Sequence, residues 1–176
     1  FTGARLNEIL QLYRDDIVEI DGVLFFDLKT EQPDQRLKNQ TSKRKVPIHR
    51  TLIDAGIAEF AESKTGRLFP GVKMSSDTYY STTFSKKFSE LLKSIGVKHT
   101  KNSFHSFRHT FEDACRACCI RHEVMEALVG HSQGGMAARY GGNYPLPPLV
   151  EAMEMLRHAG LDLAELVVLP RTDRSQ

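Results

Sequence analysis

Apolar residues near the start of the chain recur with the spacing of a helix. They are Leu6, Ile9, Leu10 and Tyr13. This period predicts a helix within residues 2–17. Two strand-like runs follow within 18–28 about an Asp-Gly turn, and two extended pieces within 35–49 flank a polar turn. The pattern predicts a small antiparallel sheet of about three strands, with Pro47 at an edge.

From residue 50 onward the pattern becomes helical. The candidate helices are 51–63, 78–95, 103–119, 122–129 and 147–158. Residues 141–148 contain two glycines and three prolines, so they are predicted to be irregular. A short apolar run and a polar end follow Gly160, and we expect that end to be disordered. The predicted fold class is α+β, one mainly helical domain with a small antiparallel sheet.

Length and composition are those of a single globular domain. The chain has 176 residues, of which 40% are hydrophobic and 26% are charged. Its apolar runs are far shorter than the roughly 20 residues of a membrane helix, and its first residues lack the layout of a secretory signal. We therefore expect a cytoplasmic protein with no membrane partner.

The distribution of charge says more than its total. The net charge is only +2, yet residues 35–50 hold six Lys or Arg and no acid, and residues 86–108 hold six against one Glu. Basic segments balanced by acidic ones elsewhere are expected of a phosphate-binding face. Either run alone is equally compatible with a solvated surface.

The three cysteines invite a metal interpretation that their number does not support. Cys115, Cys118 and Cys119 lie within five residues. Zinc prefers four ligands, and no second Cys or His pair stands at finger spacing. The three would share one helix face, so we expect buried, reduced thiols that act as small apolar side chains. No metal site is predicted.

Side chains suited to phosphate chemistry gather in the second half of the chain. His105 and Arg108 are three residues apart on a predicted helix and project from one face. Both can donate to a phosphate, and the guanidinium can do so with two nitrogens. His131 follows the end of the next predicted helix. Far upstream, Arg5 lies near a helix start, where an anion is favoured, with Glu8 on the same side to orient it. Taken singly, each has an ordinary interpretation as an ion pair or a surface residue.

A tyrosine hydroxyl is the candidate nucleophile. Tyr140 lies nine residues after His131 and is followed by two glycines. A free phenol has a pKa of about 10, so roughly a thousandth is ionised at neutral pH. Attack on phosphorus therefore needs a base or strong stabilisation of the developing charge, which positioned cations supply. Tyr144 is the alternative, but its neighbours make it look like a packing residue.

Six short motifs stand in order along the chain. They are TGARLNE at 2–8, LYRDDI at 12–17, KNQTSKRKVP at 38–47, HSFRHTF at 105–111, LVGH at 128–131 and RYG at 139–141. Together they resemble the motifs of the catalytic domain of the tyrosine recombinases, the phage-integrase family. The chain departs from the usual pattern at Arg14, where tryptophan is common, and at Asn39, where threonine is. Both changes concern packing and a turn more than chemistry.

The resemblance implies which residues bind the phosphate. Arg5 and Arg108 would hold the non-bridging oxygens of the scissile phosphate. His131 would donate a further hydrogen bond to them. His109 and Glu8 look like supporting groups.

It also implies the groups that move protons and form the bond to phosphorus. Lys38 would protonate the leaving 5′ oxygen from a hairpin loop, with Lys43 and Lys45 as alternatives. His105 would assist proton transfer and hold the phosphate. Tyr140 would attack and leave a 3′-phosphotyrosyl link and a free 5′ hydroxyl, so rejoining needs no cofactor.

The family further implies domains and partners. Residues 1–160 would form the catalytic domain, and residues 161–176 a tail that docks on a neighbouring protomer and then becomes disordered. The helices that usually precede the first arginine, and the separate domain that clasps the far side of the duplex, are expected to be missing here. Double-stranded DNA at attachment sites, a tetramer on that DNA, and DNA-bending or directionality proteins are the expected partners.

Other functions remain open at this point. A type IB topoisomerase uses similar residues and would relax supercoils without strand exchange. A DNA-binding accessory module of the same ancestry would have lost catalysis. A metal-dependent nuclease would need an acidic cluster near the histidines, which the sequence lacks. The leading hypothesis is a site-specific recombinase, the integrase of a prophage or genomic island.

Overall fold

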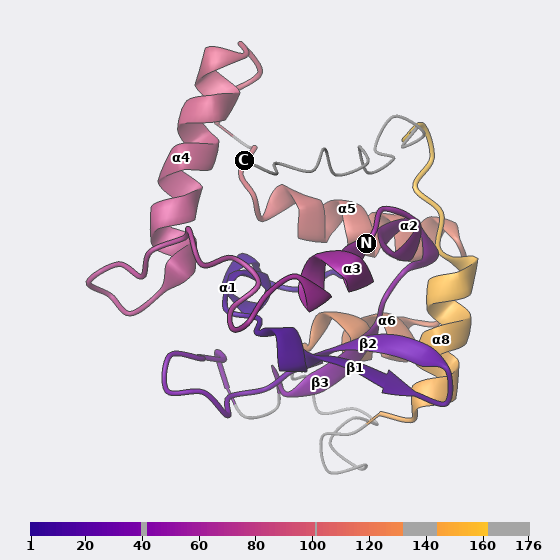
Figure 1. Ribbon diagram of the computed structural model, residues 1–176. Helices are drawn as coiled ribbons and strands as arrows, with labels where there is room; N and C mark the ends of the chain where they lie inside the picture. The colour runs from indigo at the N-terminus through magenta and orange to yellow at the C-terminus, as the bar shows by residue number, and fades with distance from the viewer. Residues whose placement is uncertain (40–41, 101, 132–143, 162–176) are drawn as a thin grey trace, which may run out of the picture.

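The computed structural model describes residues 1–39, 42–100, 102–131 and 144–161 (Figure 1). Within these ranges a small sheet lies beside a set of helices, one of which extends away from the rest. The predicted α+β class, mainly helical with a small antiparallel sheet, is confirmed. None of the described helices is both long and apolar enough to cross a membrane.

The sheet is antiparallel, with the strand order β1-β2-β3 in the described residues. Its strands are Ile17–Ile20, Val23–Leu28 and Arg44–Pro47. Asp21 and Gly22 join the first two, both with positive φ, as a two-residue hairpin turn requires. Phe26 pairs with Val46 across β2 and β3, and both are buried in the core. Pro47 lies in β3, an edge strand, as predicted.

The helices follow the predicted order with shifted ends. Their bounds are α1 Leu6–Leu10, α2 Arg50–Asp54, α3 Ile57–Glu62, α4 Tyr80–Ser94, α5 Ser106–Ala117, α6 His122–Val129 and α8 Leu146–Met155. Apolar side chains of α5, α6 and α8 pack with those of β2 and β3 into one core. In Figure 1, α8 and α6 lie beside the sheet, and α4 stands apart from them.

Three of the predicted elements differ in the structure. The helix expected within 2–17 is only the five residues of α1, followed by a 3-10 turn at Arg14–Asp16. The helix expected at 51–63 is two short helices, because Gly56 adopts φ 82° and begins a new one. Of the two extended pieces within 35–49, only the second is a strand. The first follows a turn at 32–35, in which the Gln35 side chain accepts hydrogen bonds from the amides of Glu31 and Gln32.

The cysteine prediction holds for Cys115 and is wrong for Cys119. Cys115 is fully buried, and burial raises the pKa of its thiol to about 12. Helix α5 ends at Ala117, so Cys119 lies beyond it at φ 54° and is exposed. Cys118 is half-buried, and its sulfur accepts a hydrogen bond from the Arg157 amide. The shared helix face does not exist because the helix stops too early.

Candidate active site

Arg5 is fixed at the start of α1. It is the N-cap residue, and its backbone amide donates to Glu8 Oε2 at 2.8 Å in the manner of a capping box. Its guanidinium forms an ion pair with Glu8 Oε1 at 2.7 Å. A second nitrogen donates to the Gly130 carbonyl at 3.4 Å, 125 positions away along the chain. The expected orientation of Arg5 by Glu8 is therefore present.

Arg108 approaches the same region from α5. Its side chain is 4% exposed, and Nη1 donates to the Gly3 carbonyl at 2.6 Å. Nε lies 3.5 Å from Glu112 Oε1. Nη2 is buried and has no hydrogen-bond partner among the described residues. Burial, followed by repulsion from Arg5 and Arg44, lowers the pKa of Arg108 to about 10, so the group stays charged at neutral pH.

The two histidines share this surrounding and favour the neutral form. His105 is the N-cap residue of α5, and its ring centroid lies 4.8 Å from that of His109. Burial, then repulsion by His109 and Arg108, lowers the pKa of His105. For His131, which follows α6, burial and then Arg108 lower the pKa, while Glu112 and Glu126 oppose the shift. Arg5 contributes repulsion at both rings. Of the six predicted side chains, His105 and His131 therefore each lie within electrostatic reach of Arg5 and Arg108, which also repel each other.

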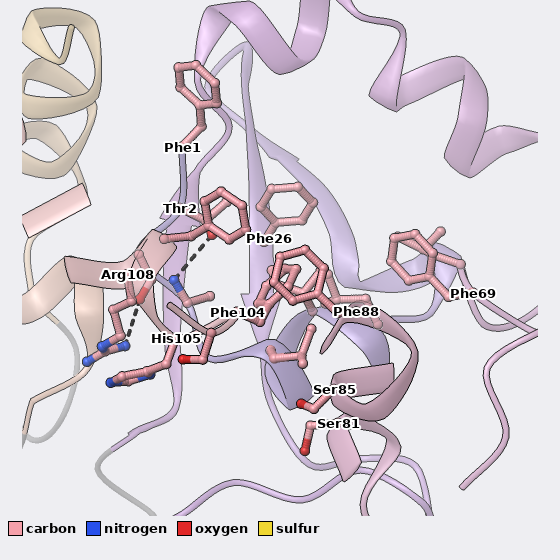
Figure 2. A pocket seen from close by; sticks show the side chains of 18 of the residues that line it. Phe1, Thr2, Phe26, Phe69, Ser81, Ser85, Phe88, Phe104, His105 and Arg108 are labelled. Atoms are coloured by element: carbon pink, nitrogen blue, oxygen red, sulfur yellow. Dashed lines mark hydrogen bonds between the residues drawn. The ribbon is translucent and has the colours of Figure 1, made fainter. Parts of the chain in front are cut away.

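Figure 2 shows His105 and Arg108 close together at one edge of a cavity. The cavity has a volume of about 620 Å³, and aromatic rings from Phe1, Phe26 and Phe88 line it. Thus His105 and Arg108 lie at the margin of the cavity and not in its apolar interior.

Arg44 supports the site and was not singled out from the sequence. It is buried, and its Nη2 pairs with Glu8 Oε2 at 2.9 Å. Its Nε donates to the Leu128 carbonyl at 2.7 Å, just before the segment that carries His131. The available signal was the alternation of β3, in which Arg44 stands two positions before the buried Val46. Burial lowers the pKa of Arg44, and attraction by Glu8 opposes the shift.

Among the described residues, Lys38 makes no polar contact with this cluster, and Tyr140 lies outside them. Lys38 is exposed in the loop between β2 and β3 and makes no hydrogen bond or ion pair with another described residue. Tyr144 packs against the core, as expected.

The loop around Lys38 is nevertheless linked to Arg5. Ser42 Oγ donates to Asn39 Oδ1, the neighbour of Lys38, and Arg5 Nη1 donates to Ser42 Oγ at 3.4 Å. Of the alternative lysines, Lys45 forms an ion pair with Asp27 at 3.5 Å, and Lys43 is exposed.

Within the described ranges, no three His, Cys, Asp or Glu side chains form a group that could hold a metal ion.

Comparison with known proteins gives one match. A sequence model described as the phage integrase family matches residues 1–145. No curated protein and no solved structure matches the chain significantly.

Proposed function

Because the chain belongs to the phage integrase family, we propose that it is the catalytic domain of a site-specific DNA recombinase, formed by residues 1–160. It cleaves and rejoins DNA through a covalent 3′-phosphotyrosyl intermediate. Double-stranded DNA is its substrate. A tetramer on two duplexes, accessory DNA-bending or directionality proteins, and docking of the tail at 161–176 on a neighbouring protomer belong to the same proposal.

The strongest support is the convergence of two guanidinium groups and two imidazoles that are far apart in sequence. Arg5 and Arg108 both bind backbone carbonyls beside this cluster, at Gly130 and Gly3. Arg108 Nη2 has no protein partner among the described residues. A buried charged donor without a partner is costly, and a phosphate oxygen would satisfy it. A scissile phosphate held there would have its negative charge offset by fixed cations.

The cleavage step assigns one task to each side chain. Arg5 and Arg108 hold the non-bridging oxygens, and His131 donates a further hydrogen bond to them. The phenol oxygen of Tyr140 forms the bond to phosphorus as the bond to the 5′ oxygen breaks. Neutral His105 assists removal of the phenol proton, in line with its lowered pKa.

The leaving oxygen also needs a proton. Lys38 gives its proton to the departing 5′ oxygen, leaving a free 5′ hydroxyl. Reversal of both transfers on a different strand completes the exchange, and the phosphotyrosyl bond conserves the energy of the phosphodiester.

The test is covalent capture on DNA. A pool of nicked duplexes with randomised sequence, incubated with the chain in EDTA, should yield protein–DNA adducts on a denaturing gel. Sequencing the captured DNA gives the substrate duplex for all later measurements. Tyr140→Phe should abolish the adduct because the nucleophilic oxygen is removed.

Tyr144→Phe is the matched control, since it removes the hydroxyl of the alternative tyrosine. Its adduct should form at the wild-type rate. An adduct that survives Tyr140→Phe, or a wild-type chain that forms none, would refute the proposed chemistry.

A further inference from the structure

Lys38, the proposed general acid, lies in a long loop whose position must be fixed for proton transfer. Lys38 lies between β2, which ends at Leu28, and β3, which begins at Arg44. It is exposed and is not held by another described residue. Proton transfer requires the ammonium group within hydrogen-bond reach of the leaving oxygen. The connection must therefore be held by contacts at residues near Lys38.

Gln11 provides such a contact two residues before Lys38. The backbone amide of Arg36 donates to Gln11 Oε1 at 2.8 Å. Gln11 is 2% exposed, and the same oxygen accepts from Asn7 Nδ2 at 2.9 Å. A buried acceptor shared by two donors has little freedom to move, because no water replaces a broken bond. The backbone of the loop at Arg36 is thus held by the buried side chain of Gln11.

Gln11 lies at the C-terminal end of α1, the helix that begins after Arg5. Arg5 is the N-cap residue of α1 and Gln11 its C-cap residue. Six residues of helix span about 9 Å along the axis. One short helix therefore holds the phosphate-binding Arg5 at one end and the lysine loop at the other, which fixes the distance between them.

A second contact lies on the same side of the loop. Tyr13 donates its hydroxyl to Asp34 Oδ1 at 2.8 Å, and Tyr80 at the start of α4 donates to Asp34 Oδ2. Asn7 joins the two contacts, since its Oδ1 accepts from the Tyr80 amide at 2.8 Å. The loop between Asp34 and Arg36 is therefore fastened to both α1 and α4.

We infer that Gln11 is a positioning residue for proton transfer by Lys38, with Tyr13 and Asp34 as a second, weaker anchor. The inference rests on the proposed function. It goes beyond it because Gln11 is buried and acts on Lys38 through the backbone of Arg36. Removing the anchor should impair protonation of the leaving group and leave phosphate binding and attack by Tyr140 intact.

The test compares two leaving groups on the captured duplex, the natural 5′ oxygen and a 5′ sulfur, which leaves without a general acid. Lys38→Ala should cleave the oxygen substrate about 100-fold more slowly and the sulfur substrate at the wild-type rate. Gln11→Met keeps the size of the side chain and removes its acceptor. It should cleave the oxygen substrate about tenfold more slowly, as expected when the acid is misplaced, and the sulfur substrate at the wild-type rate. Because Gln11 acts through Lys38, adding Gln11→Met to Lys38→Ala should slow cleavage no further.

Two further variants protect the result. Gln32→Met makes the same change at an exposed position of the same loop and should match the wild type on both substrates. Tyr13→Phe removes one hydroxyl from the second anchor and keeps the ring. It should cleave the oxygen substrate about fivefold more slowly, as expected for the loss of one hydrogen bond, and the sulfur substrate at the wild-type rate. If Gln11→Met does not fold, this variant tests whether anchoring the loop matters for proton transfer.

The outcomes separate the two proposals. If Lys38→Ala is not rescued by sulfur, the proposed role of Lys38 fails. If Lys38→Ala is rescued but the anchor variants slow both substrates equally, or neither, the inference about Gln11 is overturned while the proposed function stands.

Discussion

Glu8 is the buried carboxylate that joins two guanidinium groups at the candidate site. It is 2% exposed and lies 2.7 Å from Arg5 and 2.9 Å from Arg44. Burial by itself would raise the pKa of Glu8, but the charge and hydrogen bond of Arg44, and then the hydrogen bonds of Arg5, bring it below its usual value. Glu8 is therefore ionised and holds both arginines in place.

Glu8→Gln should destabilise the fold by about 3 kcal/mol, because it leaves the buried Arg44 charge without its partner. Urea unfolding monitored by circular dichroism measures the change. Glu62→Gln, the same substitution at an exposed helix position, should stay within about 0.5 kcal/mol of the wild type. Equal stabilities for the two variants would show that the ion pairs contribute nothing.

His49 is a second residue whose charge state is set by its contacts. It is 7% exposed, and its Nδ1 accepts from the Thr51 amide, which leaves Nε2 to donate to the Leu156 carbonyl at 3.1 Å. Burial lowers the pKa of His49, with added repulsion from Arg157, while the Leu156 carbonyl opposes the shift. The neutral ring thus joins α2 to the end of α8.

This predicts a loss of stability on acidification. Below its unfolded pKa of about 6.5, His49 binds a proton more readily in the unfolded chain, so stability falls as the pH drops towards the folded pKa. The urea midpoint should be lower at pH 5.5 than at pH 7.5. In His49→Asn, which can still cap α2, the drop should be smaller. A drop of unchanged size would contradict the assignment.

At the residue scale, the motifs identified the chemical groups and, in Glu8, one of the residues that hold them, but not the others. Arg5, His105, Arg108 and His131 were predicted and lie together. Arg44 and Gln11 were missed because their partners are distant in sequence. Arg44 meets Leu128, 84 positions away, and Gln11 meets Arg36, 25 positions away. No periodicity encodes such pairs.

At the element scale, the sequence located most helices and misjudged their ends. The helix at 122–129 was predicted with the observed bounds, since Gly130 ends it with φ 69°. The single helix predicted at 51–63 is two helices in the structure, because Gly56 adopts φ 82° and a new helix begins after it. A glycine at the end of an apolar pattern, such as Gly130, indicates a helix end. A glycine within such a pattern, such as Gly56, can either continue the helix or interrupt it, and the sequence alone does not decide between the two.

Gly130 also links an element end to the site. A Cβ at this position would lie 2.5 Å from Arg44 Nη1, so the close approach requires glycine. Gly130→Ala should cost about 2 kcal/mol more than Gly96→Ala in thermal or urea unfolding. Gly96 is the matched control, because its φ is 72° and nothing lies within 4 Å of an added Cβ. Equal costs would mean that Arg44 moves aside freely.

At the scale of the whole molecule, the candidate site is made by contacts between the chain's two halves. Arg108 holds Gly3 across 105 positions, and Arg5 holds Gly130 across 125. The N-terminal segment fits closely there, since a Cβ on Gly3 would collide with Phe111 and Val129. Neither the composition nor the periodicity of the sequence predicts contacts between residues so far apart along the chain. The resemblance to a family predicted this convergence, and the four described side chains agree with it.

The most direct measurement asks whether Arg108 offsets the charge of a scissile phosphate. The captured duplex is made with a methylphosphonate at the cleavage position, which replaces one charged oxygen by a methyl group. Adduct formation by the wild type, Arg108→Ala and Arg116→Ala is then timed on both linkages. Arg116 is the control because it lies exposed on the same helix.

The account predicts that Arg108→Ala is about 100-fold or more slower than the wild type on the phosphodiester. On the methylphosphonate, which carries one negative charge fewer, it should come within about tenfold of the wild type, and Arg116→Ala should match the wild type on both. A loss of the same size on both linkages would contradict the claim that this guanidinium binds the reacting phosphate.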